Sequence, residues 1–122
     1  MRTTVEKEAL EALTAALIRP SIPAEELLDN IALFLPRQRL ARILFFNDIY
    51  QKFLNVNGVV MEFGTQWGQN LALLSCLRGI YEPYNFTRRV IGFDTFEGLT
   101  EPDPEKDTPS EVSRKGNYGV TR

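Results

Sequence analysis

The stretch from residue 58 to residue 70 constrains the fold of this chain more than any other. It reads GVVMEFGTQWGQN, so a short apolar run of strand type and length meets an acid and then two glycines. Asn57 and Gly58 at its start form a turn signal, and after Gly68 the apolar residues return to helical spacing. The stretch therefore predicts a buried strand, a tight glycine turn and a helix that begins at the turn.

A second strand follows the predicted helix. Residues 81–86 have no regular period, and residues 90–93 then read VIGF and end at Asp94. Strand, helix and strand within about 35 residues indicate a right-handed crossover between parallel strands. The sequence thus predicts the α/β fold class, with the first β-α-β unit in residues 55–100.

Helical segments are expected ahead of this unit and an irregular one after it. Residues 5–18 and 37–54 carry apolar side chains at helical spacing, and residues 21–36 form another amphipathic segment between prolines. Beyond Leu99 the composition shifts to polar residues and proline, which prevents a long regular element. The chain is divided into an N-terminal helical segment at 1–54, the β-α-β unit at 55–100 and a polar loop or disordered tail at 101–122.

The composition excludes several classes of function. With no histidine and one cysteine, the chain cannot form a zinc site or a Ser-His-Asp or Cys-His catalytic arrangement of its own. A net charge of −2 does not indicate a protein that binds nucleic acid or an anionic membrane, because such proteins usually carry excess positive charge. No stretch approaches the roughly 20 apolar residues of a membrane span. We expect a cytoplasmic protein whose partner is a small molecule or another protein.

The glycine turn lies at the carboxyl end of a parallel strand, where ligands bind in such sheets. Glycines allow backbone angles closed to other residues, and the amino end of the next helix points its N–H groups at the ligand. Asp94 ends the second strand, where a carboxylate can accept hydrogen bonds from the two hydroxyls of a ribose. Glu62 inside a buried strand needs a positive or hydrogen-bonding partner, which an ammonium group on a ligand would supply.

Several of these residues also have a purely structural interpretation. Glu62 could pair with Arg88 or Arg89, Trp67 could cap the core beneath the turn, and Asp94 could simply end its strand. The aromatic residues of the loop after the helix are expected to pack onto the helices rather than to form a substrate lip: Tyr81, Tyr84 and Phe86.

The two motifs together resemble those of class I S-adenosylmethionine-dependent methyltransferases. EFGTQWG at residues 62–68 and GFDTFEGL at residues 92–99 are similar to the first two motifs of that family, specifically of its macrocin O-methyltransferase-like branch, which acts on sugars and natural products. The resemblance covers about residues 36–100. It implies a Rossmann-like class I methyltransferase fold that is incomplete here, with the N-terminal helices and the first β-α-β unit.

The resemblance also implies a role for each matching residue. Glu62 would meet the ammonium group at the methionine end of S-adenosylmethionine, and Asp94 would bind the ribose. The expected cofactor-binding residues are Glu62, Gly64, Thr65, Gln66, Trp67, Gly68, Asp94, Thr95 and Phe96. The catalytic base and any metal-binding acids of the family come later in the fold than this sequence reaches. No catalytic residue or metal ligand is therefore assigned, and a divalent metal cofactor is left open.

The sequence therefore predicts the amino-terminal part of an S-adenosylmethionine-dependent O-methyltransferase, inactive alone, that acts on a sugar or secondary-metabolite hydroxyl. One alternative is a non-catalytic truncated fragment that associates with partner subunits, including a homo-oligomer formed through the N-terminal helices. The apolar face of residues 40–54 would suit that role. The other alternative is a nicotinamide-dependent oxidoreductase, which requires a fuller glycine fingerprint and an acid about 20 residues after the turn.

Overall fold

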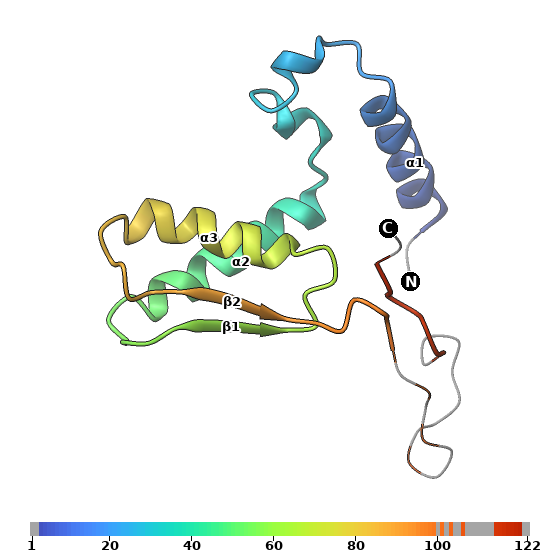
Figure 1. The fold of residues 1–122 in the computed structure, drawn as a ribbon. Helices are drawn as coiled ribbons and strands as arrows, with labels where there is room; N and C mark the ends of the chain where they lie inside the picture. The colour runs from blue at the N-terminus through green and yellow to red at the C-terminus, as the bar shows by residue number, and fades with distance from the viewer. Residues whose placement is uncertain (1–2, 100, 102, 104–105, 107–113, 121–122) are drawn as a thin grey trace. The chain divides into compact units, whose positions relative to one another are not determined.

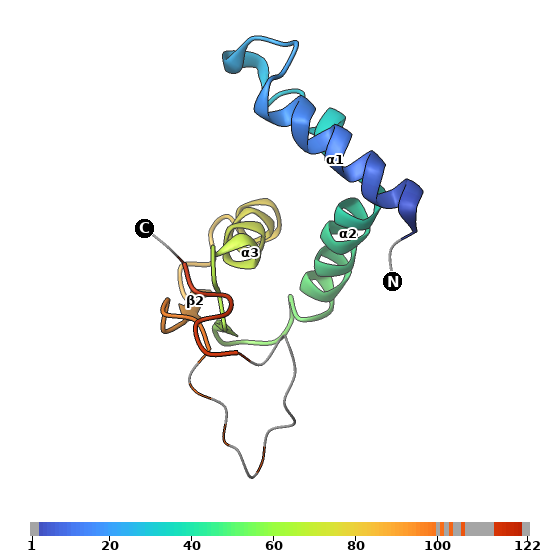
Figure 2. The same cartoon turned by 90° about the vertical axis from the view of Figure 1, so that its right-hand side faces the viewer.

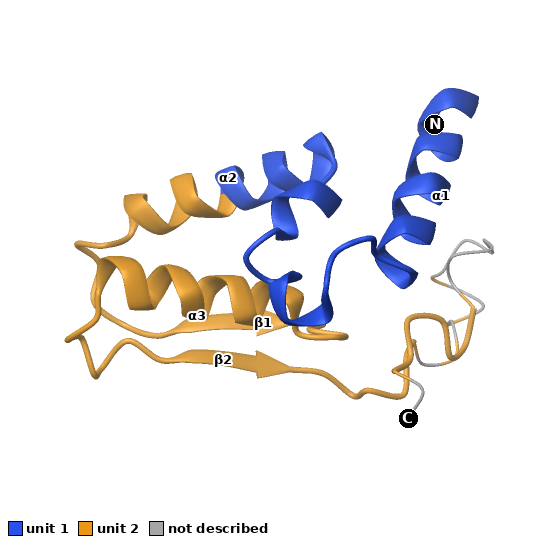
Figure 3. Ribbon diagram, turned by 90° about the horizontal axis from the view of Figure 1, so that it is seen from above, with its two compact units in different colours: residues 1–45 blue, residues 46–122 orange. Residues whose placement is uncertain are grey.

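The computed structural model describes residues 3–99, 101, 103, 106 and 114–120. They fall into two compact units, residues 1–45 and residues 46–122, each of which is described by itself (Figure 3). The regular elements are α1 (Thr4–Ile18), two short 3-10 helices (Ala24–Glu26 and Ile31–Phe34), α2 (Arg37–Lys52), β1 (Val60–Phe63), α3 (Gln69–Tyr81) and β2 (Val90–Phe93). The predicted α/β fold class is confirmed.

Helix α1 of the first unit begins with a complete capping box. The hydroxyl of Thr3 accepts a hydrogen bond from the Glu6 N–H at 3.3 Å, and the Glu6 carboxylate accepts one from the Thr3 N–H at 3.1 Å. These bonds satisfy two of the N–H groups that a helix start leaves without partners. No residue of α1 is buried, so local capping rather than packing defines this helix in the described structure.

The prediction of a continuous amphipathic helix over residues 21–36 is wrong. The structure has two short 3-10 helices there, and its apolar side chains remain exposed, with Leu28 at 83% and Leu33 at 64%. Between the two, the amide of Asn30 donates to the Glu26 carbonyl at 3.0 Å, a local bond of the kind that competes with helix continuation. Apolar residues at helical spacing do not stabilise an α-helix unless their side chains pack against another part of the protein.

Strands β1 and β2 of the second unit form a parallel pair, in register from Val60 opposite Val90 to Phe63 opposite Phe93. Figures 1 and 2 show α3 along one side of this pair. Val60 and Glu62 are half-buried, whereas Met61 between them and Phe63 are exposed. The sheet therefore buries the side that faces α3, and its other side is open among the described residues.

The core of this unit gathers on the side of the sheet that α3 covers. Tyr50, Leu74 and Leu77 are its buried apolar residues. The ring of Tyr81 stacks on that of Tyr50 with 6.0 Å between centroids, and its hydroxyl donates to Asn47 at 2.7 Å. The predicted packing of the loop aromatics is confirmed for Tyr81. It is wrong for two others, which are more than 80% exposed: Tyr84 and Phe86.

Arg88 is a buried cation at the amino end of the sheet. Its guanidinium donates to the Glu82 carboxylate at 2.9 and 3.2 Å, to the Gly58 carbonyl at 3.0 Å and to the Val56 carbonyl at 2.7 Å. Tyr50 donates to the same carboxylate at 2.7 Å. The hydrogen bonds from Arg88 hold the pKa of Glu82 at about 2, and burial raises the pKa of Tyr50 to about 12. Glu82 is therefore ionised and Tyr50 neutral at neutral pH.

No helix in the described part of the chain is long and apolar enough to cross a lipid bilayer.

Replacing Arg88 by methionine is predicted to lower the free energy of unfolding by about 3–5 kcal/mol, because Glu82 would keep its charge in a buried position without its partner. Urea denaturation measures the change. The matched control is Arg89→Met, since Arg89 is exposed and its loss should change stability by less than about 0.5 kcal/mol. Equal effects of the two substitutions would contradict the structural role given to Arg88.

Candidate functional site

The turn between β1 and α3 is built on three residues with left-handed backbone angles. Gly64, Gln66 and Gly68 have φ of 81°, 49° and 77°. The Gly64 N–H donates to the Phe93 carbonyl at 2.8 Å, which extends the pairing of the two strands into the turn, and the Gly68 N–H donates to the Thr65 carbonyl at 2.8 Å. Glycine adopts such angles without strain, so the glycine spacing produces the turn it was expected to produce.

The carboxylate of Asp94 joins this turn to the loop after β2. One oxygen accepts a hydrogen bond from the Gln66 N–H and the other from the Phe96 N–H, each at 2.7 Å. The bond from Gln66, followed by that from Phe96, lowers the pKa of Asp94 below its ordinary value. Asp94 is thus an ionised group facing the glycine turn. A carboxylate offers about four lone-pair sites, so it can accept ligand hydroxyls in addition to these two bonds.

An open hollow of about 880 Å³ lies where the two strands end. This volume is within the usual range of small-molecule sites, roughly 300–1,000 Å³. The residues that line it are Phe63, Gly64, Gln66, Gly92, Phe93, Asp94, Thr95, Phe96, Gly98, Leu99 and Tyr118. The rings of Phe63 and Phe93 stack with 5.0 Å between centroids. The hollow thus combines aromatic surface with one ionised carboxylate.

The expected cofactor-binding residues divide between this hollow and its surroundings. Five of them line it: Gly64, Gln66, Asp94, Thr95 and Phe96. Among the described residues, the other four do not. Thr65 is buried beside Gly92, and Gly68 forms the N-cap of α3. Trp67 is 67% exposed, so the interpretation that it caps the core is wrong.

Glu62, the fourth of these residues, lies on the α3 side of β1. One of its carboxylate oxygens, Oε1, accepts a hydrogen bond from the Asn70 amide at 2.5 Å. The other, Oε2, is buried and has no hydrogen-bond partner in the described part of the chain. Arg88 pairs with Glu82 instead, so the interpretation of Glu62 as its ion-pair partner is wrong. A buried carboxylate oxygen without a donor is costly, and it fits a ligand that brings a cationic N–H group.

One wall of the hollow comes from the segment that the sequence predicts to be a polar loop or disordered tail, residues 101–122. Residues 114–120 return to the loop after β2, where the Leu99 N–H donates to the Asn117 carbonyl and the Gly116 N–H to the Leu99 carbonyl, both at 2.9 Å. This return brings Tyr118 to the hollow. The available signal was Gly98, with φ of 85°, whose missing side chain admits the backbone of residues 116 and 117.

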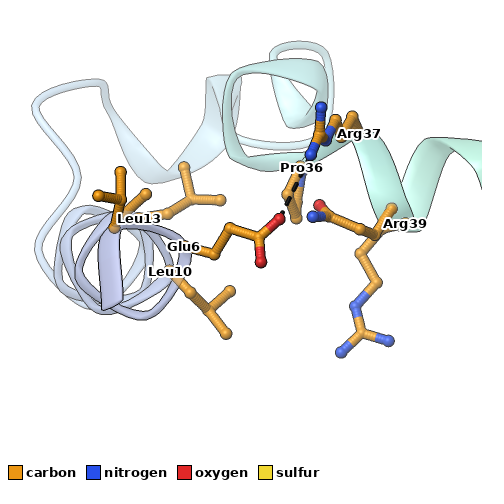
Figure 4. A pocket seen from close by; sticks show the side chains of 9 residues that line it. Glu6, Leu10, Leu13, Pro36, Arg37 and Arg39 are labelled. Carbon is orange, nitrogen blue, oxygen red and sulfur yellow. Dashed lines mark hydrogen bonds and ion pairs between the residues drawn. The ribbon is translucent and has the colours of Figure 1, made fainter. Parts of the chain in front are cut away.

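A second hollow, of about 390 Å³, belongs to the first unit (Figure 4). It is lined by Val5, Glu6, Ala9, Leu10, Leu13, Pro36, Arg37, Gln38 and Arg39. Glu6 is already bound to the α1 cap and to Arg37, which is itself 84% exposed. The acid that lines this hollow is therefore already paired within the protein. The described residues contain no cluster of acids and cysteine that could hold a metal ion.

Several solved structures are similar to this chain, and two of them are described here, while no family model and no curated protein matches it. One is the crystal structure of CalS11, calicheamicin methyltransferase, with a TM-score of 0.90 and 38% identity over 99% of this chain and 47% of that one. The other is the apo structure of CalS11, TDP-rhamnose 3'-O-methyltransferase, an enzyme in calicheamicin biosynthesis, with a TM-score of 0.75 and 44% identity over 79% and 41%. This chain thus spans less than half of the length of either. The predicted resemblance is confirmed.

The close approach of α3 to β2 at Gly92 yields a stability prediction. A Cβ at Gly92 would lie closer to the side chains of Leu71 and Thr65 than real packing allows, so Gly92→Ala should lower the free energy of unfolding by about 1–3 kcal/mol. Gly79→Ala is the control, because Gly79 lies in α3 with open space around it, and alanine there should raise the free energy of unfolding by up to about 1 kcal/mol. Urea denaturation of both variants measures these changes in the free energy of unfolding. A stabilising Gly92→Ala would contradict the described packing.

Proposed function

We propose that this chain forms part of a class I methyltransferase, that it binds S-adenosylmethionine and that it serves the methylation of a hydroxyl group on a sugar or natural product. The observation that carries the proposal is the ionised carboxylate of Asp94, held between the glycine turn and the loop after β2 beside the aromatic hollow. Similarity to a TDP-rhamnose 3'-O-methyltransferase supports a sugar as the acceptor.

The residues of the site fit the parts of this cofactor. Asp94 would accept hydrogen bonds from the two hydroxyls of the ribose, since its pKa is lowered and it stays ionised. Phe96 and Tyr118, which line the same hollow, offer apolar ring surface to the adenosine. Glu62 has a buried oxygen without a hydrogen-bond partner among the described residues, which suits the ammonium group of the methionine end. Gly64 and Gly68 keep the intervening turn free of side chains, which permits close approach of a ligand to the backbone.

When bound, S-adenosylmethionine supplies an electrophilic methyl group on its sulfonium. The residues of this chain contribute binding and orientation, because fixing the reacting groups accounts for much of the rate in such a transfer. We assign no residue of this chain as the base that takes the hydroxyl proton. A divalent metal ion is also not part of the proposal for these residues.

One alternative gains support from a specific observation and the other does not. The apolar side chains of Val5 and Ile18 at the two ends of α1 are more than 70% exposed, which favours an additional role of the N-terminal helices in association with a partner or a second copy. A nicotinamide-dependent oxidoreductase is disfavoured, because Gln66 stands where that fingerprint has a glycine and the similar structures are methyltransferases.

The proposal predicts that the chain binds S-adenosylhomocysteine and does not bind NAD in calorimetric titrations. Asp94→Ala should weaken S-adenosylhomocysteine at least roughly tenfold, since hydrogen bonds to a charged group contribute about 1.5–3 kcal/mol each. Glu97→Ala, which removes an exposed acid three residues away, should leave the affinity unchanged. Binding of NAD, or of neither ligand, would contradict the proposed function.

A further inference from the structure

We infer that Asn70 is a positioning residue for Glu62, the acid that the proposed function assigns to the ammonium group of the cofactor. The inference deepens the proposed function and rests on it, because it concerns the methionine end of S-adenosylmethionine. It assigns a role to Asn70, which none of the sequence motifs singled out.

The two residues come from adjoining elements on the same side of the sheet. Glu62 is the third residue of β1 and Asn70 the second residue of α3, and both are half-buried. The Asn70 amide donates to Oε1 of Glu62 at 2.5 Å. The outer torsion of a glutamate is otherwise broad, so a bond to one oxygen fixes the plane of the whole carboxylate. Oε2 is thereby held in one place.

The second carboxylate oxygen of Glu62, Oε2, still needs a hydrogen-bond donor. Oε2 is buried without a hydrogen-bond partner in the described part of the chain. The arginines within this unit's interior are engaged elsewhere, with Arg88 on Glu82 and Arg78 on the carbonyls of Arg88 and Asn85. An unsatisfied buried acceptor is destabilising, and a charge-assisted bond from a ligand cation would remove that cost.

The experiment compares two ligands that differ only at the methionine end. S-adenosylhomocysteine carries the amino-acid group, whereas 5'-deoxy-5'-methylthioadenosine keeps the adenosine and the sulfur but has a methyl group in its place. Calorimetric titration of the full chain should show that Asn70→Ala weakens S-adenosylhomocysteine at least roughly tenfold and leaves methylthioadenosine unchanged. Asn70→Leu, which is close to asparagine in size and also lacks the donor, gives the same comparison if the alanine variant does not fold.

A double-variant cycle separates positioning from direct contact with the ligand. Glu62→Gln retains the oxygen that accepts from Asn70 but replaces the free acceptor with an N–H donor, so it should show the same selective loss. If Asn70 acts through Glu62, the variant with both substitutions loses no more affinity than Glu62→Gln alone. Gln69→Ala, an exposed neighbour in the first turn of α3, is the matched control and should not change either affinity.

The outcomes distinguish this inference from the proposed function. Equal weakening of both ligands by Asn70→Ala, or no weakening of either, would overturn the role of Asn70 while leaving the proposed function in place. Additive losses in the double variant would also overturn it. Failure of the unaltered chain to bind both ligands would contradict the proposed function, and the inference would fall with it.

Discussion

A single buried guanidinium organises the second unit of this protein. Arg88 is 4% exposed, and its donors reach the Glu82 carboxylate and the backbone carbonyls of Gly58, Val56 and Phe53. It thereby ties the segment that leads into β1 to the segment that leads into β2. A charge can remain in such a position only where the protein satisfies it completely, because the penalty for desolvation otherwise exceeds the gain from pairing. The start of the parallel pair is fixed in this way.

The opposite end of the same two strands is joined by a charge of the other sign. Asp94 bonds the turn after β1 through Gln66 and the loop after β2 through Phe96. The two ends differ in what they leave available. Glu82 at the closed end is fully bonded by Arg88, Tyr50 and Asn85, whereas the open end adjoins the hollow and lies close in sequence to the unpartnered oxygen of Glu62. The proposed cofactor is therefore expected at the carboxyl end of the strands, where hydrogen-bonding capacity remains.

The β-α-β unit could be predicted from the sequence because its signals are local. The apolar run before Glu62 and the two glycines after it have one compatible arrangement, and the structure has that arrangement. Pairings between distant residues were not predictable. Nothing in the sequence distinguishes Glu82 from Glu62 as the partner of Arg88. The residues around Tyr118 likewise carry no sequence signal that residues 114–120 return to the site. The prediction of a regular helix over residues 21–36 was wrong for a similar reason. The spacing of the apolar residues indicates an apolar face, but it does not show whether another part of the protein buries that face.

Two-dimensional NMR of the isotope-labelled chain during titration with S-adenosylhomocysteine can show whether the glycine turn and the loop after β2 together hold an adenosyl ligand. We expect the amide signals of residues 62–68, 94–99 and 118 to shift in a saturable manner, while those around the buried Arg88 stay in place. Shifts confined to the hollow of the first unit, or no shifts at saturating ligand, would contradict this expectation.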